Sequence, residues 1–103
     1  MDDGNGNTAL HYAAWEGKDA VATQLVNANA NVNVNVVDNR GNTPLHIAAA
    51  YGHAVVANLL LGAGANPKAV NNIGNTPAQR AEQRGHRELA QRLRQAEASA
   101  ASK

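Results

Sequence analysis

Apolar residues in the middle of the chain recur at helical spacing in two short runs. Leu45, Ala48 and Ala49 give a first helix a narrow apolar stripe, and residues 55–61 give a second helix a bulkier apolar face. Gly52 lies between the two runs, where glycine readily ends a helix. The pattern predicts a helix, a turn and a second helix.

The same pattern occurs three times. Gly-Asn-Thr stands at residues 6–8, 41–43 and 74–76, and a glycine follows each threonine after nine residues. Threonine suits these positions because its side-chain oxygen can accept a hydrogen bond from a free amide at a helix start. The predicted helices lie near residues 8–16, 18–27, 43–51, 53–62, 76–84 and 86–95.

The repeat period is near 33 residues, and the middle copy carries Thr43-Pro44-Leu45-His46 with Ala48 two positions later. This motif and period resemble the ankyrin repeat over residues 3–95. The resemblance implies an all-α solenoid of stacked helix–turn–helix units with β-hairpin fingers between them. It divides a domain at residues 1–95 into repeats at about 3–37, 38–70 and 71–95. The chain is either a three-repeat protein or a part of a longer array.

The last repeat differs from the middle one in a way that is typical of a C-terminal capping repeat. Arg92 and Arg94 stand where the middle repeat has Leu59 and Leu61. A terminal repeat needs such polar residues because its outer face meets water. Residues 96–103 have no apolar periodicity and are predicted to form a disordered C-terminal tail.

An Asn-Val tract at residues 31–37 makes the first repeat two residues longer than the second. Strand side chains alternate with a period of two, so an added pair leaves all later residues on their original faces. The prediction is a longer arm in the first finger, with a bulge as the alternative. The chain is expected to be a monomer, and the 31–37 arm is the segment through which copies would self-associate, because exposed strand edges can pair.

Composition excludes several classes of function. The chain has 103 residues, a formal net charge of +1 and no cysteine. The small charge argues against a general phosphate-binding surface and hence against a nucleic-acid partner. Without cysteine there is neither a disulfide framework nor a thiolate site. No apolar run reaches membrane-spanning length, so no membrane partner is expected. The expected location is cytoplasmic or nuclear.

The four histidines are the main candidates for metal binding or catalysis. His11 and His46 follow the leucine of the repeat motif, and His53 and His86 follow the glycine between the helices. The resemblance assigns all four to structural positions of the repeat. Their spacing matches no zinc-binding pattern, and the sequence has neither a catalytic triad nor a phosphate-binding glycine motif. We therefore expect no catalytic, cofactor-binding or metal site, and a protein that is not an enzyme.

The resemblance further implies a binding groove lined by the fingers and the first helix of each repeat. Tryptophan, tyrosine and arginine commonly anchor protein interfaces, and the single tryptophan of the chain falls at such a groove position. The competing interpretation is that this ring only packs on its surface neighbours. The candidate partner-binding residues are Trp15, Glu16, Arg40, Asn42, Tyr51, Ile73 and Arg84.

The predicted function is that of a non-enzymatic protein–protein interaction module or scaffold that binds a protein partner through this groove. Two alternatives remain open at this stage: a substrate-recruiting segment of a larger multidomain enzyme, and a stand-alone inhibitor of an enzyme. The fold gives no ligand by itself, because specificity depends on the residues at the surface.

Overall fold

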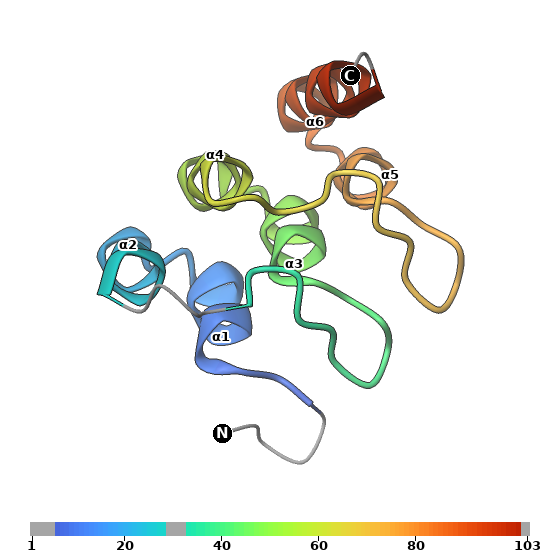
Figure 1. Ribbon diagram of the computed structural model, residues 1–103. Helices are drawn as coiled ribbons and strands as arrows, with labels where there is room; N and C mark the ends of the chain where they lie inside the picture. The colour runs from blue at the N-terminus through green and yellow to red at the C-terminus, as the bar shows by residue number, and fades with distance from the viewer. Residues whose placement is uncertain (1–5, 29–32, 102–103) are drawn as a thin grey trace.

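Three helix pairs stack in a row in the computed structural model, which describes residues 6–28 and 33–101 (Figure 1). Within these residues there are six helices and no strand. The helices are α1 (Ala9–Glu16), α2 (Asp19–Ala28), α3 (Pro44–Tyr51), α4 (Ala54–Gly62), α5 (Pro77–Gln83) and α6 (Arg87–Ala101). The predicted all-α repeat solenoid is confirmed.

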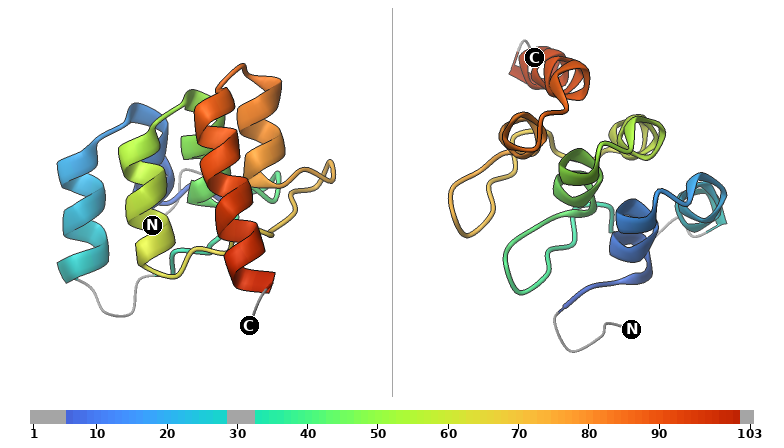
Figure 2. Two further views of the ribbon diagram at one scale, coloured as in Figure 1. Left: turned by 90° about the horizontal axis from the view of Figure 1, so that it is seen from above. Right: turned by 180° about the vertical axis from the view of Figure 1, so that it is seen from behind.

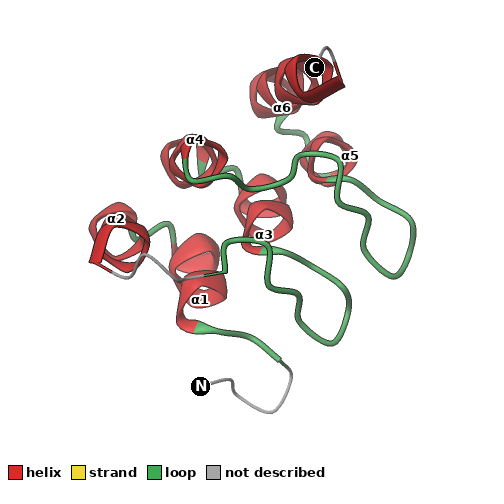
Figure 3. Cartoon of the chain, in the orientation of Figure 1, coloured by secondary structure: helices red, strands yellow, loops and turns green. Residues whose placement is uncertain are grey.

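The helices form two layers. Seen from above, α2, α4 and α6 lie side by side in one layer, with α1, α3 and α5 behind them (Figure 2). The loops before α3 and α5 project from the α1–α3–α5 layer, away from the outer helices (Figure 1). We call these loops the 38–42 finger and the 71–75 finger. In the described residues they are turns rather than paired strands (Figure 3).

The first helix of each repeat begins at a threonine, as the motif predicts. The hydroxyl oxygen of Thr43 accepts a hydrogen bond from the backbone amide of His46 at 3.3 Å, and the amide of Thr43 donates to His46 Nδ1 at 3.1 Å. This reciprocal capping box satisfies two amides that would otherwise lack partners at a helix start. The first repeat has the same capping box between Thr8 and His11.

Alanine makes the close stacking of the inner helices feasible. Ala48 and Ala49 on α3 are fully buried, as are the larger Leu45 on α3 and Leu60 on α4. Small side chains let neighbouring helices approach, and the leucines fill the space between the layers. The buried hydrophobic core consists of alanine, valine and leucine.

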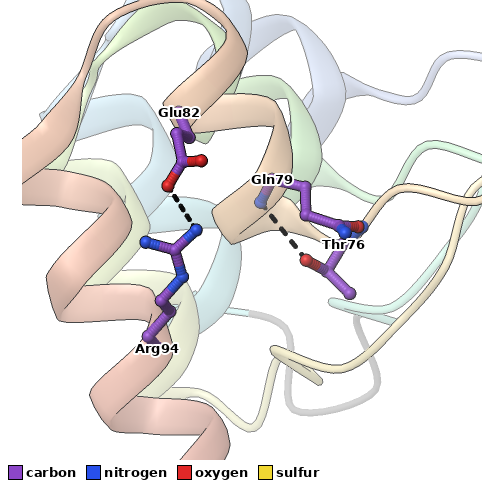
Figure 4. Close-up of polar contacts among 4 residues, drawn as sticks. All are labelled: Thr76, Gln79, Glu82 and Arg94. Atoms are coloured by element: carbon purple, nitrogen blue, oxygen red, sulfur yellow. Dashed lines mark hydrogen bonds and ion pairs between the residues drawn. The ribbon is translucent and has the colours of Figure 1, made fainter.

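The last repeat presents charged side chains where the middle repeat is apolar. Glu82 of α5 forms an ion pair with Arg94 of α6 (Figure 4). Glu82 stands at the position of Ala49, which is fully buried in the middle repeat. The Nε of Arg92 donates to the side-chain oxygen of Asn58 at 3.0 Å. The last repeat therefore has the polar outer side that its sequence predicts.

The predicted disordered tail at residues 96–103 is wrong for residues 96–101, which continue α6 without interruption. Alanine and glutamate are strong helix formers, and lengthening an existing helix avoids the unfavourable nucleation step. Apolar periodicity is absent from this stretch, but a helix that is already packed can extend without it. Residues 102–103 lie outside the described part of the chain.

The predicted longer arm in the first finger does not lie in residues 33–42, the part of that finger that the structure describes. The amide of Asp38 donates to the carbonyl oxygen of Asn42 at 3.0 Å, and Asn71 makes the equivalent bond to Asn75 at the same distance. The turns that precede the fingers match as well: residues 33 and 36 are bonded at 3.3 Å, as are residues 66 and 69. The two fingers therefore have the same length.

The two additional residues lie upstream of the finger, between Leu25 and Asn33. The described part of this stretch is the end of α2, which runs to Ala28. Residues 29–32, which follow it, lie outside the described residues. The predicted bulge and the predicted self-association through residues 31–37 depend partly on this stretch and stay predictions.

Candidate partner-binding surface

Three aromatic side chains form a row across α1 and α3. The ring centroids of Tyr12 and Trp15 are 6.0 Å apart, and those of Trp15 and Tyr51 are 6.1 Å apart, with interplanar angles of 25° and 17°. Tyr12 and Trp15 share a helix face because they are three residues apart. Trp15 and Tyr51 lie near the C-terminal ends of the first helices of neighbouring repeats. We call these three residues the ring row.

The turns between the helices fix the position of the ring row. The Nε2 of His53 donates to the carbonyl oxygen of Trp15 at 3.0 Å, which ties the end of α1 to the start of α4. Gly17 makes this approach feasible, because a Cβ at that position would lie 2.7 Å from the His53 ring. The spacing between Trp15 and Tyr51 is therefore set by the repeat junction.

Arg84 extends the row into the third repeat. Its guanidinium carbon lies 5.6 Å from the centroid of the Tyr51 ring, within cation–π distance. Arg84 is the residue that ends α5. One aromatic or cationic group from each of the three repeats thus lies on a continuous strip of surface.

An open hollow of about 490 Å³ lies between the ring row and the 38–42 finger. The rings of α1 and α3 line one side, and polar finger residues line the other. Trp15 is 50% exposed and Tyr51 is 40% exposed, so both rings remain accessible. The lining residues are Asn7, His11, Tyr12, Trp15, Asp38, Asn39, Arg40, Asn42, Ile47 and Tyr51.

Hydrogen bonds fix the backbone of the 38–42 finger, which lines one side of the hollow. Asp38 Oδ1 accepts from the backbone amides of Arg40 at 2.9 Å and of Asn42 at 3.0 Å. The amide of Asn72 in the next finger donates to the carbonyl oxygen of Arg40 at 2.9 Å. The backbone of Arg40 is therefore held from two sides, while its exposed side chain remains at the hollow.

The histidines of the repeat motif are structural, as the resemblance implies. His46 Nδ1 accepts the Thr43 amide proton, so Nε2 carries the ring hydrogen and donates to the carbonyl oxygen of Asn75 at 2.8 Å. Burial lowers the pKa of His46 below its usual value of 6.5. His11 makes the equivalent bond to Asn42. Across residues 6–28 and 33–101, no three histidine, aspartate or glutamate residues gather as a metal site would need.

The hollow brings together four of the predicted partner-binding residues, namely Trp15, Arg40, Asn42 and Tyr51, and Arg84 lies beside it on Tyr51. Glu16 and Ile73 are not among the lining residues. Glu16 is exposed at the end of α1, and Ile73 is 74% exposed in the 71–75 finger.

Asn42 lines the hollow, but its polar groups already serve the fold. Its carbonyl oxygen accepts from His11 at 2.8 Å, its amide donates to Asp38, and its side-chain oxygen accepts from Asn71 at 2.9 Å. Three of its four polar groups are therefore engaged within the fold. Its contribution to the hollow is therefore the shape of the finger.

Sequence reasoning missed Tyr12, Ile47 and Asp38 as lining residues. The signal for Tyr12 was present, because residues three apart on a helix share a face and Trp15 was already a candidate. The signal for Ile47 was present too, because it lies four residues before the candidate Tyr51 and shares its helix face. The place of Asp38 depends on the turn geometry of the finger, which no spacing rule predicts.

Comparison with known families supports the repeat assignment across most of the chain. A family model described as "Ankyrin repeats (many copies)" matches residues 25–81, and one described as "Ankyrin repeat" matches residues 5–39. No curated protein matches the chain. In the described residues, no helix is both long enough and apolar enough to cross a membrane.

Proposed function

The chain belongs to the ankyrin-repeat family, and we propose that it binds a protein partner at the hollow between the ring row and the 38–42 finger. Ankyrin repeats generally act as protein–protein interaction modules. The proposal is that this chain works as a non-enzymatic module or scaffold of that kind, with Trp15 and Tyr51 as its anchors.

The observation that carries the proposal is the exposure of two adjacent large rings on a strip that spans all three repeats. Trp15 and Tyr51 stack at 6.1 Å and are both at least 40% exposed. An exposed tryptophan leaves apolar area in contact with water, and covering it with a partner would be favourable. Rings whose spacing is fixed by the fold also lose little conformational freedom on binding.

Replacement of Trp15 by alanine tests the proposal. We expect Trp15→Ala to weaken partner binding by about 2 kcal/mol or more, as loss of an interface anchor does. The partner is first recovered by affinity purification from the native source, and its dissociation constant is then measured for both proteins by calorimetry.

The matched control is Gln91→Ala, because Gln91 is exposed on α6 and lies away from the hollow. It should change neither binding nor the urea midpoint. Trp15→Ala should also leave the urea midpoint close to that of the wild type, since half of the ring is already exposed. If Trp15→Ala unfolds the chain while the folded fraction binds normally, the ring is structural and the proposed surface is wrong.

A further inference from the structure

We propose that the hollow takes an acidic peptide segment of a partner, one that places an apolar or aromatic side chain on the ring row and a carboxylate beside Arg40 and Arg84. This inference rests on the proposed function and names the chemistry of the partner. It is carried by the charges around the hollow.

Two guanidinium groups flank the hollow without a carboxylate of their own. Arg40 lines it from the finger, and Arg84 lies on the Tyr51 ring. Among the described residues, Glu82 and Arg94 form an ion pair, whereas Arg40 and Arg84 form none. Both are exposed, so each is available to a charged group of a partner.

The nearby acidic residues do not offset these two cations. Asp38 lines the hollow, but one of its carboxylate oxygens already accepts two backbone amides of the finger. Amides that donate to a carboxylate partly satisfy its charge, so Asp38 acts mainly as a brace for the turn. Glu16 is exposed at the end of α1 and is not among the residues that line the hollow.

The rings alone would accept either a cationic or an apolar side chain, and the charges around the hollow favour the apolar one. A cationic side chain could also bind to aromatic faces. However, Arg84 already lies against Tyr51, and a second cation there would meet repulsion from Arg84 and Arg40. Charges within about 10 Å of each other are only partly screened at moderate salt. An apolar group with a neighbouring carboxylate satisfies both the rings and the guanidinium groups.

The open hollow suits a peptide segment as the occupant. Its volume of about 490 Å³ lies in the general range of ligand-binding clefts. Its walls come from two helices and a finger, so an extended segment could contact the rings and the finger at once. Arginine at the rim can also form paired hydrogen bonds with a carboxylate, which adds orientation to charge attraction.

Selection from a displayed library of random short peptides tests the inference directly. The wild-type chain is immobilised, and the recovered peptides are sequenced. We expect enrichment of sequences that combine glutamate or aspartate with leucine or an aromatic residue. Synthetic versions without tryptophan are then titrated against the chain, with fluorescence as the signal, because Trp15 is the only tryptophan.

Charge-neutral variants supply the second measurement. The double variant Arg40→Gln/Arg84→Gln should bind the selected peptide about tenfold more weakly, since rim charges contribute moderately to affinity. The matched control is Arg87→Gln, which removes an exposed arginine at the start of α6, outside the hollow. It should leave the affinity unchanged. A peptide with glutamine in place of its acidic residues should lose affinity for the wild type by a similar factor.

The outcomes separate the inference from the proposed function. Neutral or basic peptides that lose binding to Trp15→Ala would overturn the acidic partner and leave the proposed surface standing. Peptides that bind Trp15→Ala as well as the wild type would overturn both. If the library yields no binder, the inference that the partner binds through a peptide segment is wrong. The purified native partner still tests the proposed function in that case.

Discussion

The 38–42 finger and the 71–75 finger have the same backbone hydrogen bonds but different surroundings. In the first, a Cβ on Gly41 would lie 2.9 Å from the backbone nitrogen of Asn72 in the next finger. In the second, no described atom lies within 4 Å of the equivalent point on Gly74. Both glycines have positive φ, 79° and 87°. Local sequence sets the shape of each finger, and the neighbouring repeat sets how much a substitution would disturb it.

The same contrast recurs in the helix caps. In the middle repeat, His46 caps its own helix through Nδ1 and bonds the 71–75 finger through Nε2. In the last repeat, Gln79 replaces the histidine, and its side-chain oxygen accepts the Thr76 amide at 2.8 Å. Gln79 thus caps its helix as His46 does, but in the described residues it makes no bond to another finger. The middle repeat should therefore be more sensitive to substitution than the last.

The largest expected effect is in the core of the middle repeat. Leu60 is fully buried between the two layers. Leu60→Ala should destabilise the chain by roughly 2–4 kcal/mol, because it leaves a cavity. Urea denaturation followed by circular dichroism measures the change, with the exposed Gln91→Ala in the last repeat as control. An unchanged midpoint for Leu60→Ala would show that the repeat register is wrong.

The two finger glycines give the sharpest test of the comparison. Gly74→Ala should cost about 1–2 kcal/mol, the strain of alanine in a left-handed conformation. Gly41→Ala carries the same strain plus the close approach to the Asn72 backbone, so we expect it to cost at least about 1 kcal/mol more. Equal urea midpoints for the two variants would contradict the claim that the neighbouring finger decides the difference.

His46 should give the chain a pH dependence. Its pKa is lowered by burial in the folded state, so the unfolded chain binds this proton more tightly. The stabilisation from the neutral ring is complete above the unfolded value of 6.5 and is lost as the pH falls from there toward the folded pKa.

Denaturation at a series of pH values measures this loss. His46→Gln imitates Gln79 and should reduce the pH dependence. It should also lower stability at pH 7 by about 1 kcal/mol, because the bond to Asn75 is lost. A variant with the full wild-type pH dependence would show that another group is responsible.

The smallest expected effect is that of the extra Asn-Val pair. Because residues 31–37 alternate, deleting Val34 with Asn35 or Asn31 with Val32 leaves the same sequence. The shortened chain has the spacing of the middle repeat between Leu25 and the finger. We expect its unfolding free energy to match the wild type within about 0.5 kcal/mol, since a modest change in loop length has a small entropic effect.

Deletion of Val34 alone is the matched comparison. Val34 is buried, and the side chain of Asn33 accepts the amide of Asn35 at 2.9 Å in the turn before the finger. Removing one residue breaks the alternation, so the buried valine and this turn cannot both be kept. Its urea midpoint should be the lower of the two. A double deletion that proves more harmful would show that the added residues contribute to packing.

The sequence by itself determined the repeat, its helices and its caps. Threonine at the helix start, glycine at the turn and leucine at helical spacing act through interactions within a few residues of each other, so their effects are visible in the chain. The capping boxes at Thr8, Thr43 and Thr76 and the left-handed turn at Gly52 are of this kind. The candidates Trp15 and Tyr51 were found in the same way, from their place in the repeat.

Only the tertiary structure decided the length of α6 and the shape of the hollow. The hollow depends on how far α1 lies from α3 and on how the 38–42 finger is braced by Asp38 and by Asn72. Part of this arrangement depends on contacts between residues more than 30 positions apart, such as Arg40 with Asn72 and His53 with Trp15. Each of these contacts forms because stacking brings surfaces of different repeats together. The spacing of residues within one repeat does not predict the distance between two repeats.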